Sequence, residues 1–472
     1  MRYRTETDSI GSREVPENAY YGIQSMRAAE NFRMTGLHIH PEMIRSMADV
    51  KAAAAVTNYE TGALDEEREK VILRACAEMK EGRFDSEIIV DPIQGGAGTS
   101  LNMNVNEVLA NRAIELLGGI KGDYKRVHPN DHINMSQSTN DVFPTAGKIA
   151  ACRLVQKAEK ELRRLHKALE EKSVEFYPVI KMGRTQLQDA VPIRLGQEFA
   201  SYAAAVGRDI RRMETAAGEM RTVNLGGTAI GTGINATPRY VQRVVHNLEQ
   251  ITSLKLTQSE DMIDGTSNLD PFAAVSGSVK ACAVTLSKIV SDLRLMSSGP
   301  RTGLGEILLP GKQNGSSIMP GKVNPVIPEV VNQAAFQIFG NDVTITLAAE
   351  SGQLELNAFE PVIFYNLFQA VDLLGHAAAT FTDNCICGIQ ADAARCKAMV
   401  ENSVGTATAL CPYLGYTKAA EIAKKAVREN RNLRELVLEE RLMDEEELDR
   451  VLDSYAMTEP GRHKSEGAIL ND

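Results

Sequence analysis

Five long segments in the middle of the chain repeat apolar residues at intervals of three and four, the spacing that places side chains on one face of an α-helix. Lys and Glu fill much of the rest of the segment 148–176, whose apolar stripe consists of Leu154, Val155, Ala158, Leu162, Leu165 and Leu169. The same spacing marks 195–220, 272–298, 328–350 and 361–385. A helix with an apolar face must bury it, so the pattern predicts a mainly α fold built around a central bundle of long helices.

Two of these helices are apolar around more than one face. The stretches 275–290 and 336–347 offer few positions suited to water, and the alanine run 203–205 leaves a narrow surface that allows close helix packing. A helix that is apolar on several sides is buried on several sides. The sequence therefore predicts that the bundle packs against another subunit.

Changes of pattern along the chain predict three domains. Residues 1–140 are mixed and mostly helical, with an irregular or extended stretch at 14–22 and helices near 43–60 and 104–117. Residues 141–393 form the helix-bundle domain and include a loop at 310–325. Residues 394–472 form a small C-terminal helical domain, with an acidic helical segment at 444–454. A length of 472 residues exceeds one ordinary core, which agrees with several domains.

Composition narrows the class of protein. The chain is 43% hydrophobic and 24% charged, typical of a soluble globular protein, and we expect no apolar run long enough to cross a bilayer. The first residues, MRYRTETDSIGSRE, contain no apolar signal region. A net charge of −10 argues against nucleic acid and membrane surfaces as partners. Seven cysteines without a disulfide rhythm indicate reduced thiols, so a cytoplasmic enzyme is predicted.

Residues 315–325, GSSIMPGKVNP, gather reactive and anion-binding groups in one short loop. Gly315 and Gly321 allow backbone angles closed to other residues, while two prolines restrict the path of the chain. The polar side chains of the loop are Ser316, Ser317, Lys322 and Asn324. Polar turns of this composition are common, but eleven such residues in one run favour a functional loop around a small anion.

Two further polar segments precede predicted helices. Residues 95–102, GGAGTSLN, offer backbone amides and the Thr99 hydroxyl, and residues 136–141, SQSTND, offer Ser138, Thr139 and Asn140. A helix N-terminus attracts an anion through its free amides and its dipole. Taken alone, each segment is more often only a helix cap. Together with Lys322, these donors indicate a site for a small anion.

Two other signals carry little weight. GTGINA at 231–236 nominally matches a dinucleotide-binding fingerprint, but it lacks a βαβ setting, so a loop near the site is favoured. Two histidine pairs, His38 with His40 and His128 with His132, have no convincing third metal ligand nearby, which favours surface or hydrogen-bonded histidines. No metal site is predicted.

The loop 315–325 resembles the signature of the fumarase/aspartase superfamily, and the resemblance runs from about Thr5 into the C-terminal region. Its continuation, VIPEVVNQ at 326–333, is similar to the aspartase branch, as are PENAYYG at 16–22 and GRTQLQDAVP at 183–192. Class II fumarases typically continue with Thr-Gln after the same Asn-Pro, and they usually place His where this chain has Gln186.

The resemblance implies both a fold and an activity. The fold is mainly α with three domains, and its central helices form the shared core of a homotetramer in which three chains assemble each site. The activity is the reversible deamination of L-aspartate to fumarate and ammonia by a carbon–nitrogen lyase, with β-proton abstraction through an enediolate. No cofactor is implied as a requirement, and the resemblance permits activation by a divalent cation such as Mg²⁺.

The resemblance also implies roles for residues at the matching motif positions. Ser316 is implied as the catalytic base, acting as an alkoxide that needs nearby amides or a cation to stabilise it. The residues implied for the β-carboxylate of aspartate are Thr99, Ser138, Thr139 and Ser317. Those implied for the α-carboxylate are Thr185, Lys322 and Asn324, while Asn140 accepts from the α-ammonium and Gln186 stands nearby. The glycine-rich segment 299–314 is expected to act as a lid.

Some features keep other hypotheses open. Met135 stands where relatives commonly have Lys, and HPND at 128–131 resembles the secondary dicarboxylate site of class II fumarases. Fumarate hydratase is therefore the alternative activity. Gln186 opposes it, because glutamine cannot exchange protons as the fumarase histidine does beside the glutamate matched here by Glu329. Lyases of larger succinyl substrates and a catalytically idle structural oligomer are weaker hypotheses.

Overall fold

The protein is described by a computed structural model covering residues 2–460, and it is mainly α-helical. Contacts divide it into two compact units. Unit 1 comprises residues 1–160, 209–283 and 334–376, and unit 2 comprises 161–208, 284–333 and 377–472. The predicted division into three domains along the chain stays a prediction.

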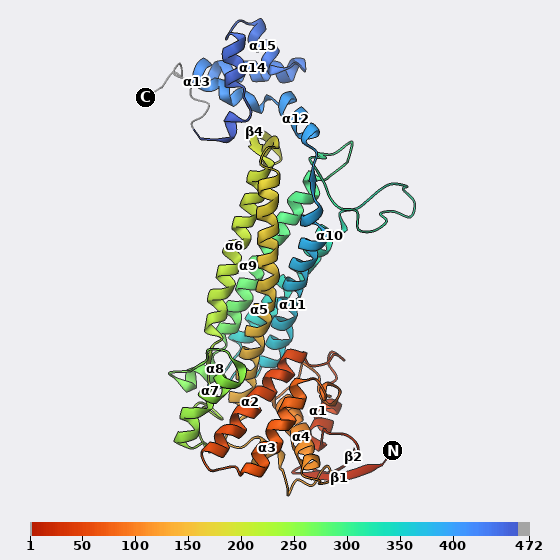
Figure 1. Ribbon diagram of the computed structural model, residues 1–472, viewed down its shortest axis with the longest axis vertical. Coiled ribbons are helices and arrows are strands. Elements are labelled where there is room, and N and C mark those ends of the chain that lie inside the picture. The colour runs from red at the N-terminus through yellow and green to blue at the C-terminus, as the bar shows by residue number, and fades with distance from the viewer. Residues whose placement is uncertain (1, 461–472) are drawn as a thin grey trace. The chain divides into compact units, whose positions relative to one another are not determined.

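Five long helices contribute residues to both units and confirm the predicted bundle (Figure 1). They are α5 (Thr139–Glu175), α6 (Leu195–Glu219), α9 (Asp270–Met296), α10 (Val326–Glu350) and α11 (Glu360–Asn384). Their ends agree closely with the predicted segments except for α5, which begins at Thr139 rather than near 148. Pro144 lies inside this helix and interrupts the helical pattern, which hides the true start from the sequence.

Within unit 1 the long helices pack through an aromatic core. The ring of Phe364 on α11 lies 5.0 Å from that of Phe143 on α5 and 5.0 Å from that of Phe272 on α9. The other helices of the unit are α1 (Ile23–Asn31), α2 (Pro41–Glu60), α3 (Glu66–Lys80), α4 (Thr99–Leu116), α7 (Pro238–Thr252) and α8 (Met262–Ser267). Its strands are β1 (Tyr3–Asp8), β2 (Gly11–Pro16), β5 (Thr222–Val223) and β6 (Thr257–Gln258), which pair as β1 with β2 and β5 with β6.

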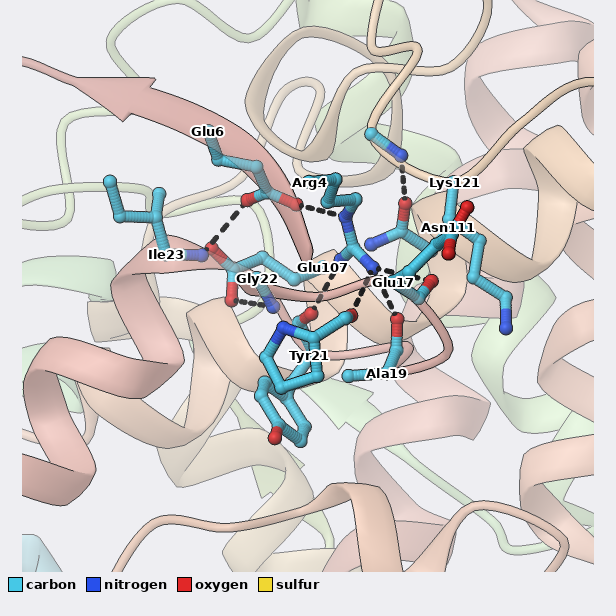
Figure 2. Close-up of polar contacts among 12 residues, drawn as sticks. Arg4, Glu6, Glu17, Ala19, Tyr21, Gly22, Ile23, Glu107, Asn111 and Lys121 are labelled. Carbon is cyan, nitrogen blue, oxygen red and sulfur yellow. Dashed lines mark hydrogen bonds and ion pairs between the residues drawn. The ribbon is translucent and has the colours of Figure 1, made fainter. Parts of the chain in front are cut away.

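The segment after β2 is irregular, as predicted for 14–22, and Figure 2 shows how side chains hold it. Arg4 donates to the carbonyl oxygens of Pro16 (2.9 Å), Ala19 (2.8 Å) and Tyr21 (2.8 Å). The buried carboxylate of Glu107, on α4, accepts from the backbone N–H of Gly22 at 2.8 Å and caps the start of α1. These bonds satisfy the polar groups of a buried turn and fix α1 against α4, whose first residue is Thr99.

Unit 2 carries a β-hairpin and a set of short helices. The hairpin pairs β3 (Ile180–Thr185) with β4 (Gln188–Arg194), and a second pair joins β7 (Ile307–Leu308) to β8 (Gln390–Ala391). The short helices are α12 (Ala393–Asn402), α13 (Cys411–Leu414), α14 (Tyr416–Glu429), α15 (Leu433–Glu439) and α16 (Glu445–Val451). Leu410, Ile422 and Leu436 belong to the buried cluster that joins the last four of these helices.

The long helices expose large apolar side chains. On α10, Phe336, Val343 and Leu347 are each 59% exposed, as expected for a surface that another chain covers. The stretches Asp270–Met296 and Glu360–Gly388 are also long and apolar enough to cross a membrane by length and composition, so the expectation that no run would be is wrong. About half of each apolar window, 50% and 56%, is buried inside the structure, as in the core helix of a bundle.

Candidate functional site

The N-terminus of α4 presents the first predicted site residue. Gly98 precedes it with φ +89°, and a Cβ there would lie 2.5 Å from the ring of Phe143, so only glycine fits. Thr99 is the first helical residue, its side chain is exposed, and its hydroxyl donates to the carbonyl oxygen of Gly96 at 2.7 Å. The N-cap of α4 is Gly98, which belongs to the segment 95–102, so this segment does cap the helix, although not through the Thr99 side chain. The Thr99 hydroxyl oxygen retains acceptor capacity.

Ser138, Thr139 and Asn140 lie together at the start of α5. The Ser138 hydroxyl accepts from the backbone N–H of Asn140 at 3.3 Å, so the capping hypothesis holds for this serine. The buried Thr139 hydroxyl accepts from Nδ2 of Asn102 at 3.0 Å, and Asn102 lies one turn beyond Thr99 on α4. Unit 1 therefore brings the first turns of α4 and α5 together with their hydroxyl groups.

The amide of Asn140 has a fixed orientation. Its Nδ2 donates to the carbonyl oxygen of Ala229 at 2.7 Å, which lies in the loop before α7. An amide that uses its nitrogen this way presents Oδ1 as an acceptor on its other side. Ala229 is close to the glycine-rich stretch 231–236, which is a loop between β5 and α7. β5 and β6 pair in parallel on either side of α7, so a βαβ connection does surround this loop, but each strand has only two residues.

A buried pair of ionisable groups, Lys51 and Asp141, lies beneath this segment. Lys51 is fully buried, and its amine donates to Oδ1 of Asn134 (2.8 Å) and Oε1 of Gln137 (3.0 Å). Asp141 accepts from the backbone N–H of Ser138, Gly226 and Thr228 at distances between 2.9 and 3.1 Å. Burial lowers the pKa of Lys51 to about 7 and raises the pKa of Asp141 to about 6.

Sequence reasoning missed Lys51. Its only signal in the sequence is a single lysine inside the alanine-rich run ADVKAAAAV of α2. A helix face in contact with water would carry several charged residues, so one isolated lysine in such a run indicates a buried amine. The side chain reaches the loop that contains Met135, so an amine does lie beneath this segment although position 135 carries none.

The hairpin of unit 2 presents Thr185 and Gln186. Thr185 ends β3, and Gln186 and Leu187 form a two-residue turn with φ +54° and +62°. Both φ values match the type I′ turn that suits the twist of a hairpin. The side chains of Thr185 and Gln186 are exposed at this tip.

The loop after β7 presents the remaining predicted residues. The Ser316 hydroxyl oxygen accepts from the backbone N–H of Ile318 (3.2 Å) and Met319 (3.0 Å). Asn324 donates from Nδ2 to the carbonyl oxygen of Gly315 at 3.4 Å and closes the loop on itself. Ser317 and Lys322 are exposed. Two amides that point at one hydroxyl oxygen would stabilise negative charge on it.

The predicted residues thus form two groups. Unit 1 holds Thr99, Ser138, Thr139 and Asn140, and unit 2 holds Thr185, Gln186, Ser316, Ser317, Lys322 and Asn324. Part of the expected lid is fixed: Arg395 donates to the carbonyl oxygens of Gly303 (3.0 Å) and Leu304 (3.1 Å), and β7 pairs with β8. The expected lid is therefore narrowed to the stretch after β7, and its closure stays a prediction.

A metal site would need several His, Cys, Asp or Glu side chains close together. Between residues 2 and 460 no group of three or more His, Cys, Asp or Glu side chains could hold one. The paired histidines have other partners: Nδ1 of His132 accepts from the backbone N–H of His128 at 2.8 Å, and His40 bonds Asp372 at 2.9 Å. The side chains described between residues 2 and 460 therefore do not fit a resident metal.

The bundle and these polar loops define a lyase. The family model described as Lyase matches residues 11–340, which is more than half of the chain, so the chain belongs to this lyase family. The model described as Fumarase C C-terminus matches residues 407–459. Aspartate ammonia-lyase of Bacillus subtilis (strain 168) is 51% identical over 459 residues, covering 97% of each chain. Aspartate ammonia-lyase of Pseudomonas fluorescens is 51% identical over 461 residues, covering 97% of this chain and 96% of its own.

Solved structures give the same assignment. The chain matches a cobalt-bound fumarate lyase:delta crystallin from Brucella melitensis with a TM-score of 0.95 and 49% identity, covering 97% of this chain and 100% of that one. It matches a class II fumarase from Schistosoma mansoni with a TM-score of 0.94 and 34% identity, covering 98% and 100%. The predicted family and fold class are confirmed.

Proposed function

We propose that the protein is an aspartate ammonia-lyase that converts L-aspartate reversibly to fumarate and ammonia. The observation that carries the proposal is near 50% identity to aspartate ammonia-lyases over almost the whole chain. The loop after β7 adds chemical support, since Ser316 has the two amide donors that an alkoxide base needs.

The proposed site holds aspartate by its two carboxylates and its ammonium group. Residues implied for the β-carboxylate are Thr99, Ser138, Thr139 and Ser317, and those for the α-carboxylate are Thr185, Lys322 and Asn324. Asn140 receives the α-ammonium at Oδ1, which can still accept a hydrogen bond because the amide donates to Ala229 through Nδ2. Gln186 lies at the same end of the substrate.

The reaction then proceeds in two steps. The Ser316 alkoxide takes the proton from Cβ, and the electron pair of that C–H bond moves onto the β-carboxylate to give an enediolate dianion. The enediolate returns this pair to form the Cα–Cβ double bond, and the C–N bond breaks so that ammonia leaves. Hydroxyl and amide donors around the β-carboxylate lower the barrier, each by about 3 kcal/mol in comparable oxyanion sites.

The working enzyme is proposed to be a homotetramer whose central helices pack together and whose sites are each built from three chains. Exposed Phe336, Val343 and Leu347 on α10 support a covered face there. The exposed tips at Thr185 and Lys322 support contact with surfaces of other chains. We also propose a cytoplasmic location, which the free state of all seven cysteines supports, and no requirement for an organic cofactor. Titrating the enzyme with Mg²⁺ while fumarate formation is followed tests whether the ion activates it.

The test is to mix purified protein with L-aspartate, and separately with L-malate, and to follow fumarate absorbance. Fumarate from aspartate alone supports the proposal, whereas fumarate from malate alone would establish the hydratase instead. Ser316→Ala should abolish turnover while retaining affinity for a dicarboxylate inhibitor such as succinate. Lys322→Ala should weaken that affinity sharply; an unchanged affinity would remove Lys322 from the carboxylate site.

A further inference from the structure

A cluster of four buried or half-buried charges lies behind the hairpin of unit 2. We call it the Glu306 cluster: Lys181, Arg184, Glu198 and Glu306. The Glu306 carboxylate is 0% exposed, accepts from Nη1 of Arg184 at 2.7 Å, and lies 3.1 Å from Nζ of Lys181. Lys181 also bonds both oxygens of Glu198, at 2.9 and 3.0 Å. Within the cluster, Glu306 alone contacts both cations on β3, which are Lys181 and Arg184.

The segment 309–325 between β7 and α10, which carries Ser316 and Lys322, is called the serine loop, and the backbone of Glu306 anchors its start. Its N–H donates to the carbonyl oxygen of Met296 at the end of α9 (2.9 Å), and its own carbonyl accepts from the N–H of Asp392 (2.9 Å). β7 starts at the next residue and pairs with β8. The segment that carries Ser316 and Lys322 departs from this anchored point.

The side chain of Glu306 reaches the other structure that carries site residues. Arg184 lies on β3 directly before Thr185, so the ion pair holds the end of this strand, next to the turn of the hairpin. A second set of bonds extends the cluster, since the Ser403 hydroxyl donates to Asp189 on β4 (2.7 Å) and Asp189 lies 3.8 Å from Arg184. The hairpin tip is thereby tied to the root of the loop through side chains alone.

From these contacts we infer that the Arg184–Glu306 ion pair is a positioning device, which fixes Thr185 for the α-carboxylate of the substrate and couples the hairpin to the root of the serine loop. This inference rests on the proposed function. Neither side chain is among the residues proposed to bind the substrate or to take its proton. Burying such a pair costs desolvation energy that an apolar pair of similar volume would avoid, so its presence is better explained by geometry than by stability.

Glu306→Gln tests the inference, because it keeps the shape of the side chain and removes its charge. We expect KM for L-aspartate to rise roughly ten- to a hundredfold, as for a site group displaced by up to about 1 Å, with kcat much less affected. The inhibition constant of succinate should rise in parallel. That of 3-aminopropanoate, which lacks the α-carboxylate, should stay within about twofold of the wild type.

Two further variants separate positioning from stability. Glu198→Gln removes a carboxylate from the same cluster without touching Arg184 and should leave the ratio of the two inhibition constants unchanged. The double variant Arg184→Gln/Glu306→Gln removes both charges of the ion pair, so neither partner is left unpaired. It should raise the ratio of the succinate to the 3-aminopropanoate inhibition constant as Glu306→Gln does, and it should fold at least as well as that single variant. Hydrogen exchange of the amides at 185–188 should quicken in both Glu306 variants.

Equal weakening of succinate and 3-aminopropanoate would overturn the inference, as would a lower melting temperature with an unchanged KM. The wild-type assay keeps this distinct from the proposed function. If the wild type makes no fumarate from aspartate the function fails, and if it does while the ratio stays constant only the positioning role fails.

Discussion

Replacing Gly315 by alanine should remove most of the activity without unfolding the protein. A Cβ on Gly315 would lie 1.6 Å from the carbonyl oxygen of Lys322 and 2.5 Å from its carbon. An ordinary carbon–oxygen contact is about 3.3 Å, so the two strands of the serine loop must separate by about 1.7 Å. Both atoms in conflict belong to the backbone, and no side chain can turn away to relieve the contact.

The size of the effect follows from this displacement. Ser316 is next to Gly315, and a misplacement of about 1 Å lowers rates roughly a hundredfold, which equals about 2.7 kcal/mol in activation free energy. The loop is exposed from Gly311 to Asn314 and from Ser317 to Val323, so few buried contacts are lost. We expect kcat/KM to fall at least a hundredfold while the melting temperature moves by less than about 2 °C.

Gly311→Ala is the matched control. A Cβ there has one neighbour, Cγ1 of Val323 at 3.5 Å, which is an ordinary contact. This variant should keep its activity within about twofold of the wild type, as for most surface substitutions. Fumarate absorbance at saturating and limiting aspartate measures both variants. If Gly315→Ala kept the kcat/KM of the wild type, the close approach of Gly315 to the carbonyl oxygen of Lys322 would be refuted. If both variants lost activity equally, the flexibility of glycine would matter rather than this approach.

Three further predictions concern other parts of the chain. Asn140→Ser should lower kcat/KM for aspartate roughly ten- to a hundredfold, because one hydrogen bond to a charged group is lost, while inhibition by succinate, which has no ammonium, changes less than about threefold. Phe336→Asp should place a charge on the exposed face of α10, so sedimentation should show smaller species together with lost activity; a tetramer of full activity would contradict the shared core. The pKa of Lys51 is lowered from 10.5 to about 7 in the folded protein. Between these two pH values the unfolded chain holds a proton on Lys51 that the folded protein has lost, so this residue makes the free energy of unfolding rise with pH across that range. Lys51→Met should flatten that rise in the melting temperature, and an unchanged slope would show that other groups cause it.

Much of the fold could be predicted because one physical signal repeats through the chain. Apolar spacing over long segments located α6, α9, α10 and α11 closely, since each helix must bury one face. The start of α5 was missed because residues 139–147 are polar at first and contain Pro144. The apolar windows of α9 and α11 were underestimated for a related reason: a helix surrounded by other helices needs no polar face, so its composition approaches that of a membrane span.

The candidate site could be predicted only where its residues lie in short motifs. Ser316, Lys322 and Asn324 share one loop, and Thr99 and Asn140 each lie at a helix start, so their neighbours in sequence reveal them. Arg184 and Glu306 are 122 positions apart, and nothing in local spacing links them. Lys51 is hidden in a similar way, because its partners Asn134 and Gln137 belong to a different segment.

Two buried carboxylates, Asp141 and Glu306, are related in the same way to predicted site residues. Asp141 holds the backbone of Ser138 from beneath, and Glu306 holds Arg184 beside Thr185. Each burial costs several kcal/mol, which apolar packing would avoid, and the helix bundle already supplies apolar packing in quantity. What the bundle cannot supply is a fixed direction for polar side chains at exposed turns, because those turns have little to pack against. A hydrogen-bonded carboxylate accepts donors only from particular positions, so it fixes such a turn at one geometry. Under the proposed function, the long helices therefore supply stability, while Asp141 and Glu306 fix the placement of the groups proposed to bind the substrate.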